Sequence, residues 1–150
     1  MRDVLKHKSL VFYQYDIRDG ETPEIIASKL YGDSGYHWII LLANDIVNPY
    51  YDWPMSYENL INTIRKKYTT PQLDGLIYAY QTTHHYADKH GNVIDETSYA
   101  ALPANERSKV SVYDWEVSQN ESKRRISLLD KNYVDQVDKE ADAIMKRALV

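Results

Sequence analysis

Four residues whose side chains could bind a metal lie within one short segment: His84, His85, Asp88 and His90. Imidazole and carboxylate groups bind zinc, and a bound zinc can activate water for hydrolysis. The segment reads as an extended strand, on which neighbouring side chains point to opposite faces, so we expect His84 and His85 to diverge. No cysteine and no HExxH helix accompanies them. We interpret the segment as the polar tip of a hairpin, with a metal hydrolase as the weaker alternative.

Other groups capable of catalysis show no recognisable arrangement. The chain has no GxSxG turn and no phosphate-binding or dinucleotide-binding loop, and its 150 residues include only 5 glycines. The basic run Lys123–Arg125 could contact phosphate, but Glu121 and Asp130 flank it and favour ion pairing. A formal net charge of −4 gives no support for nucleic-acid binding. We expect no catalytic residue, no cofactor, no metal and no nucleic-acid partner.

The most distinctive side chains are the rings of the run Asn-Pro-Tyr-Tyr-Asp-Trp-Pro, residues 48–54. Proline fixes φ and lacks a backbone donor, so we expect a stiff, extended connector. Tyrosine and tryptophan combine apolar area with a polar tip, which suits either the edge of a core or a binding surface. The chain has 14 Tyr and 3 Trp against 1 Phe, so many rings should reach water or a partner. The candidate interface rings are Tyr50, Tyr51, Trp53 and Tyr57.

A strand and two helices precede these rings. Residues 11–17 alternate in polarity as a strand does. Thr22 and Pro23 are typical of the first positions of a helix, and Gly32 is placed to end it. Residues 36–43 are almost wholly apolar and predict a second helix at the centre of this unit.

Elements of a different kind are expected after the proline-rich run. Ser56 is a helix cap, and the apolar stripe that follows predicts a third helix ending near Tyr68. The period then changes from helical to extended. We expect a first hairpin from residues 76–86 and 93–99, a second from 110–117 and 124–129, and a closing helix over 130–147.

The closing helix carries a narrow apolar seam. Its members are spaced by three and four residues, as in a coiled coil, and are Val134, Val137, Ala141 and Ile144. Such a seam packs either on a partner or on the body of the same chain, and both alternatives stay open.

These elements predict an α+β fold with two domains. Residues 1–68 would hold the N-terminal unit with its arm and extra helix, and residues 69–150 the hairpins with the C-terminal helix. The longest apolar run, Trp38–Ala43, is too short to span a bilayer, so we expect no membrane partner.

The N-terminal pattern resembles the LysM module over about residues 13–55. The matching residues are Gly20, Glu21, Thr22, Trp38, Asn44, Asn48 and Pro49. The resemblance implies a βααβ fold, and modules of this family typically bind glycans that contain N-acetylglucosamine. Where a module would close with its second strand, this chain continues with Met55-Ser56 and a further helix, so one edge of the glycan groove should be altered.

A wider set of motifs resembles the LysM-containing baseplate wedge subunit of contractile-tailed, T-even-type phages, the wedge protein 53 family. The motifs lie at residues 19–27, 31–38, 48–54, 113–117 and 120–126 and in the closing helix. The resemblance implies a structural protein of the virion tail, synthesised and assembled in the host bacterial cytoplasm. Its partners would be other wedge and hub proteins, with copies arranged in a ring. The alternative is a cell-wall module that stacks glycan rings on the aromatic residues.

Overall fold

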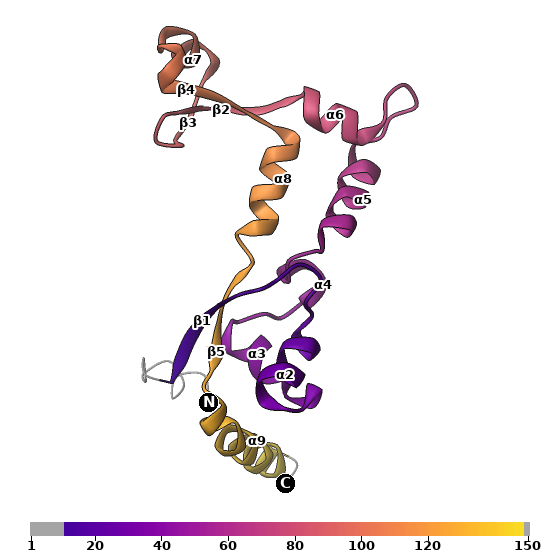
Figure 1. The fold of residues 1–150 in the computed structure, drawn as a ribbon, viewed down its shortest axis with the longest axis vertical. Coiled ribbons are helices and arrows are strands. Elements are labelled where there is room, and N and C mark those ends of the chain that lie inside the picture. Colours follow the sequence, from indigo (N-terminus) through magenta and orange to yellow (C-terminus); the bar gives the residue numbers. More distant parts are fainter. Residues whose placement is uncertain (1–10, 149–150) are drawn as a thin grey trace. The chain divides into compact units, whose positions relative to one another are not determined.

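A computed structural model describes residues 11–148, and its helices and small antiparallel sheets form the predicted α+β fold (Figure 1). The chain divides into two units, of which the first combines Met1–Pro54 with Lys123–Val150 and the second is Met55–Ser122. The sequence suggests a different division, after Tyr68. That position lies inside the second unit, between two helices that pack on each other. The expected N-terminal arm, residues 1–10, lies outside the described residues.

The first unit is built from elements at both ends of the chain. They are β1 (Phe12–Asp16), α2 (Pro23–Tyr31), the 3₁₀ turn η1 (Ser34–Tyr36), α3 (His37–Ala43), α4 (Pro49–Asp52), β5 (Arg125–Leu129), η3 (Lys131–Tyr133) and α9 (Val134–Ala148).

The helix boundaries of this unit follow the cap residues in the sequence. The Thr22 side chain accepts from the N–H of Ile25 at 3.4 Å, and Pro23 occupies the first turn of α2, where no backbone donor is needed. Gly32 ends the helix with φ of 85°, a left-handed conformation that glycine adopts at little cost. The strand and both helices predicted for residues 11–43 are confirmed.

The strand at residues 125–129 does not form the second hairpin expected from the sequence. It pairs with β1 in an antiparallel ladder that runs from Phe12 opposite Leu129 to Asp16 opposite Arg125 (Figure 1). The prediction of a hairpin with residues 110–117 is wrong because Ser111 caps a helix there. Its hydroxyl accepts from the N–H of Asp114 at 3.0 Å and donates to the Asp114 carboxylate at 2.7 Å.

The core of the first unit consists of two adjoining apolar clusters. The first joins the β1–β5 ladder to the two helices through Ile17, Ile26, Ala27, Ile40, Trp53, Ile126 and Leu128. The second joins the same ladder to the start of α9 through Val11, Ile39, Leu129, Val134 and Val137.

The second unit consists of short helices that alternate along the chain with the strands of a three-stranded sheet. Its elements are α5 (Tyr57–Tyr68), α6 (Gly75–Gln81), β2 (Thr83–Asp88), β3 (Val93–Ile94), α7 (Glu96–Ala101), η2 (Ala104–Glu106), β4 (Arg107–Ser111) and α8 (Val112–Glu121). The strand order is β3-β2-β4. Its core contains Leu60, Ile64, Ala79 and Val112.

Half of the strand predicted for residues 76–86 is helical instead. Asp74 caps α6 by accepting from the N–H of Leu76 at 2.9 Å, and the strand begins only at Thr83. The hairpin of β2 and β3 is confirmed, although β3 is two residues long and residues 96–101 are helical. The helix that Ser56 was expected to cap is confirmed as α5.

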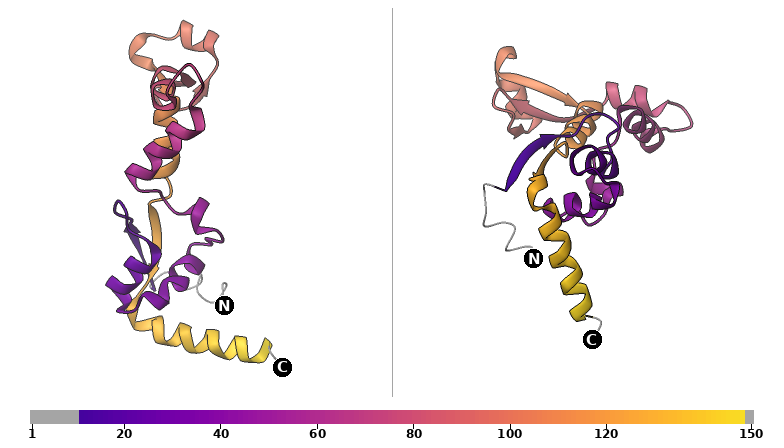
Figure 2. Two further views of the ribbon diagram at one scale, coloured as in Figure 1. Left: turned by 90° about the vertical axis from the view of Figure 1, so that its right-hand side faces the viewer. Right: turned by 60° about the horizontal axis from the view of Figure 1, so that its bottom comes forward.

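The closing helix predicted from the sequence is confirmed as η3 followed by α9. Figure 2 shows α9 extending outward beyond the end of β5. Within residues 11–148, no helix combines the length and the apolar character needed to cross a bilayer.

Candidate assembly surfaces

The run between the two prolines is a helical turn and not the extended connector expected. Asn48 caps it by accepting from the N–H of Tyr50 at 3.1 Å, and Pro49 occupies its first position. A proline fits the first turn of a helix because the N–H at that position has no intrahelical acceptor. The turn ends at Asp52, and Trp53 returns to extended geometry.

The rings of this turn divide between surface and core. Tyr50 is 90% exposed and Tyr51 is 74% exposed, whereas Trp53 is 7% exposed. The indole N–H of Trp53 donates to the carbonyl of Glu21 at 2.8 Å, so its polar atom is satisfied inside the unit. Trp53 therefore holds the turn to the core, and the rings available to a partner are those of Tyr50 and Tyr51.

A hollow next to the exposed turn is lined by residues from separate segments of the chain. Its volume is about 470 Å³. It is lined by Thr22, Pro23, Glu24, His37, Leu41, Pro49, Tyr50 and Trp53. Because the Trp53 ring is largely buried, Tyr50 is the exposed ring that this hollow offers for stacking. The other exposed tyrosine of the turn, Tyr51, does not line it.

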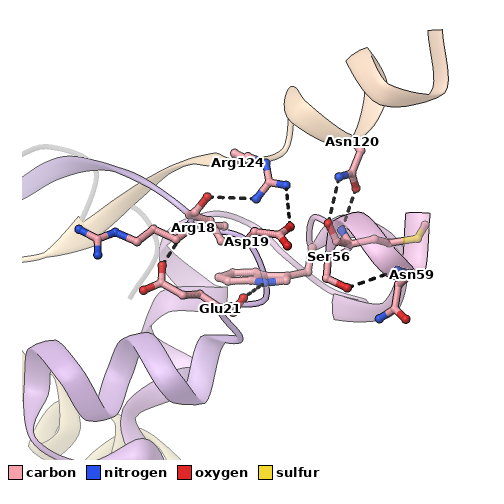
Figure 3. Close-up of polar contacts among 10 residues, drawn as sticks. Arg18, Asp19, Glu21, Ser56, Asn59, Asn120 and Arg124 are labelled. Atoms are coloured by element: carbon pink, nitrogen blue, oxygen red, sulfur yellow. Dashed lines mark hydrogen bonds and ion pairs between the residues drawn. The ribbon is translucent and has the colours of Figure 1, made fainter. Parts of the chain in front are cut away.

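Glu21, the acidic residue of the motif turn, joins the strand, the turn and the first helix. Gly20 makes the turn with φ of 76°. The Glu21 carboxylate accepts from the N–H of Arg18 at 2.9 Å (Figure 3). It also accepts from the Tyr15 hydroxyl at 2.8 Å and from Lys29 at 3.2 Å. Partial burial opposes ionisation, but these donors outweigh it and hold the pKa of Glu21 below its ordinary value. We assign Glu21 a structural role.

Asn44, the residue after α3, holds β5 in place through both groups of its amide. Its Oδ1 accepts from the N–H of Ser127 at 2.7 Å, and its Nδ2 donates to the carbonyl of Ser127 at 2.8 Å. Nδ2 also donates to the carbonyl of Ile40 at 2.8 Å. The amide therefore satisfies backbone groups on the side of β5 that faces away from β1.

The buried Asn120 makes a similar pair of bonds in the second unit. Its Oδ1 accepts from the N–H of Met55 at 2.7 Å, and its Nδ2 donates to the carbonyl of Met55 at 3.0 Å (Figure 3). Asn120 therefore ties the first residue of this unit to the last helix of the same unit.

The basic run at residues 123–125 is used inside the first unit. Arg124 donates to the carboxylate of Asp19 and to the carbonyl of Ile17, both at 3.2 Å (Figure 3). Lys123 donates to the carbonyl of Tyr51. The expectation of ion pairing holds for Arg124, which forms an ion pair with Asp19. These contacts fix the start of β5.

The apolar seam of α9 changes from buried to exposed along the helix. Val134 and Val137 are 3% and 4% exposed and pack in the core of the first unit. Ala141 is half-buried, and Ile144 is 49% exposed. Trp38 packs against the buried part and also borders the exposed part. The N-terminal half of the seam therefore packs on the body of the same chain, whereas the C-terminal half is open to a partner.

A tyrosine cluster on the second unit includes one predicted interface ring and others that sequence reasoning missed. Tyr57 is 59% exposed and Tyr80 is 53% exposed. The rings of Tyr80 and Tyr113 stack with centroids 4.2 Å apart. A hydrogen bond with Tyr80, partial burial and a further bond with Tyr57 raise the pKa of the Tyr113 hydroxyl. The excess of tyrosine was the available signal, but it does not locate the cluster.

The histidine segment differs from the expectation in one respect. The strand register shifts between Thr83 and His85, and this irregularity brings the Nδ1 atoms of His84 and His85 to 2.8 Å, so the rings do not diverge. The His84 ring also stacks on Trp115, with centroids 4.4 Å apart. Asp88 accepts from the backbone of His90 and stabilises the hairpin turn. In the part of the chain that the structure describes, no group of three or more potential ligands gathers as a metal site requires.

Exposed tyrosines on a turn of fixed geometry are typical of surfaces that bind other macromolecules. Comparison with known proteins indicates the class of protein to which this chain belongs. A family model described as "Base plate wedge protein 53" matches residues 3–109. The "Baseplate wedge protein gp53" of Enterobacteria phage T4 is 24% identical over 147 residues, covering 89% of this chain and 74% of that protein.

These matches place the chain in a class of structural proteins of the phage tail baseplate. The chain belongs to the base plate wedge protein 53 family. The sequence motifs at residues 19–38 and 48–54, which lie inside the matched region, had indicated the same family. The comparisons give no support to the glycan-binding alternative.

Proposed function

We propose that this chain joins wedge subunits of a tail baseplate to each other and around the central hub, as a structural protein without catalytic activity. Family membership supports the structural role. The observation that carries the joining role is the exposed pair Tyr50 and Tyr51 on a turn that Asn48 and Trp53 fix at both ends. Large rings on a fixed backbone lose little conformational entropy when they bind.

The first unit is a LysM-like module in this proposal. Its order of strand, helix, helix and late strand supports this assignment, as does the bidentate bond from Asn44 to the late strand. The sequence shows a further helix after Met55-Ser56 where the closing strand of a module would be, and in this proposal residues 125–129 would supply that strand. The second unit is then an insertion between the helices and the closing strand of the module.

Other wedge and hub proteins are the partners in this account. The copies would stand at equivalent positions in a ring, so each copy would present unlike surfaces to its two neighbours. The tail baseplate is the site of function, and assembly would take place in the cytoplasm of the host bacterium. Tyr50 and Tyr51 on the first unit and Tyr57 on the second are the proposed contact rings.

Co-assembly with the wedge proteins of the same phage tests this proposal. The double variant Tyr50→Ser/Tyr51→Ser should fold normally, because both rings are exposed, and should enter the assembly at least tenfold more weakly. Val93→Ser is the matched control, because Val93 is 70% exposed and lies on the other unit. The readout is the fraction of chain that co-sediments with purified wedge proteins.

Two results would count against the joining role. The first is a double variant that co-sediments as well as the Val93→Ser control. The second is a chain that ignores the wedge proteins but is retained on purified peptidoglycan through a salt wash, with loss of retention in Tyr50→Ser. That pattern would favour the glycan-binding alternative.

A further inference from the structure

The C-terminal half of α9 and Trp38 form an apolar groove on the first unit. The groove has a volume of about 400 Å³ and is lined by Trp38, Asp138, Ala141, Ile144 and Met145. Ile144 is 49% exposed and Met145 is 58% exposed, so large apolar groups meet water along this face. Single exposed apolar residues are ordinary, but a continuous apolar groove with a polar rim is typical of an interaction site.

The spacing of the groove residues indicates what shape fits there. Ala141 and Ile144 continue the three-and-four spacing that begins at the buried Val134 and Val137. On a helix this spacing gives a narrow straight seam, which is the shape that receives the side chains of a second helix. The small side chain of Ala141 allows that helix to approach closely beside the wall made by Trp38. An α-helix is therefore the occupant that the seam fits.

One carboxylate, that of Asp138, lines the groove. Partial burial raises the pKa of the Tyr36 hydroxyl above its ordinary value, and nearby carboxylates raise it further. These carboxylates belong to Asp138, Asp135 and Asp33. Among residues 11–148, no ion pair joins any of the three to a cation. A carboxylate at this position favours a partner with positive charge beside its apolar stripe.

We infer that this groove binds an amphipathic helix of another wedge protein, one whose apolar stripe is flanked by lysine or arginine. The identity of the partner as a wedge protein rests on the proposed function. A second copy of this chain is the competing occupant, and the crosslink described below distinguishes it from a wedge-protein helix.

A pair of aspartate substitutions on neighbouring residues tests the groove. Ile144→Asp puts a charge on the seam, whereas Ala143→Asp puts the same charge on an exposed position that does not line the groove. Both residues are exposed, so both variants should fold. In co-sedimentation with the wedge proteins of the same phage, Ile144→Asp should bind about tenfold more weakly and Ala143→Asp like the unmodified chain.

Photocrosslinking identifies the occupant in the same reconstituted assembly. With p-benzoylphenylalanine at position 145, the expected product joins this chain to a wedge-protein segment with apolar residues at helical spacing and flanking basic residues. Raising the salt concentration should weaken binding of the unmodified chain and have less effect on Asp138→Lys.

Three results would overturn the inference: equal binding of the two aspartate variants, a crosslink to a second copy of this chain, or a crosslink to a segment that is acidic or not helical. Its failure is distinguishable from failure of the proposed function. If the unmodified chain joins the wedge proteins and Ile144→Asp joins equally well, only the groove assignment falls. If the unmodified chain does not join them, both fall.

Discussion

Aromatic side chains in this protein take different roles according to their surroundings. Three aromatic rings lie between Pro49 and Pro54, and sequence alone treats them as one patch. The structure separates them, because the Trp53 indole N–H has an acceptor inside the unit whereas Tyr50 and Tyr51 point outward. An amphipathic ring is buried where its polar atom finds a partner.

Replacing Trp53 by phenylalanine should destabilise the first unit. Trp53→Phe removes the donor to the Glu21 carbonyl and leaves part of the indole volume empty, so we expect the free energy of unfolding to fall by about 2 kcal/mol. Tyr50→Phe, at an exposed site, should change it by less than about 0.5 kcal/mol. Chemical denaturation followed by circular dichroism measures both values. Equal stability of the two variants would place Trp53 outside the core.

Glu21 should make the stability of the first unit dependent on acid pH. Its pKa is lower in the folded chain than in the unfolded chain, so the unfolded state binds more protons as the pH falls. The stabilisation is therefore complete above the unfolded value, about 4.3, and is lost as the pH falls through the lower folded value. The difference in unfolding free energy between the unmodified chain and Glu21→Gln should be largest above about pH 5 and shrink toward pH 3. A constant difference over this range would show that the ionised carboxylate is not what holds the turn.

At the scale of elements, the sequence predicts what local chemistry determines. Cap residues and glycines predict the positions of α2 and α5 correctly, because each helix boundary depends on residues within one turn of it. The helices α6 and α8 were read as strands, although Asp74 and Ser111 are cap residues as good as those recognised elsewhere. The apolar and aromatic residues after both caps have β propensity, and packing against other helices decided their conformation.

The packing of α6 on α5 depends on a residue without a side chain. A Cβ at Gly75 would lie 2.1 Å from the carbonyl oxygen of Arg65 and 2.5 Å from the nitrogen of Thr69. Gly75→Ala should therefore push the helices apart and lower the melting temperature of the second unit, at a cost of about 3 kcal/mol or more. In the control Gly35→Ala, the new Cβ would be 3.2 Å from the Asp33 side chain, which can move. Calorimetry compares the two, and similar melting temperatures would contradict this close approach.

The arrangement of the whole molecule depends on contacts between residues far apart in sequence. The strand that pairs with β1 comes after the entire second unit, so a pattern read locally pairs it with the wrong segment. The same limit applies to the candidate surfaces. The rings of Tyr50 and Tyr51 stand out in the sequence because their motif is continuous, although the helical turn that carries them is not predicted. The tyrosines that stack in the second unit come from different helices.

The exposed half of α9 shows the same combination of predictable and unpredictable features. The spacing of its seam was visible in the sequence. Its division into a buried and an exposed part is not visible there, because Val134 and Val137 are buried by contacts with residues distant in sequence, Val11 and Ile39 among them. The exposed part of the seam is the surface that the proposed partner helix would cover.

Sedimentation of purified wedge proteins, with and without this chain, tests the joining role most directly. If the chain joins wedges, the other wedge proteins should sediment as separate wedges in its absence and as larger assemblies when it is added, and the chain should move with the larger species. Assemblies that form equally well without it, or a chain that stays free while they form, would contradict the account.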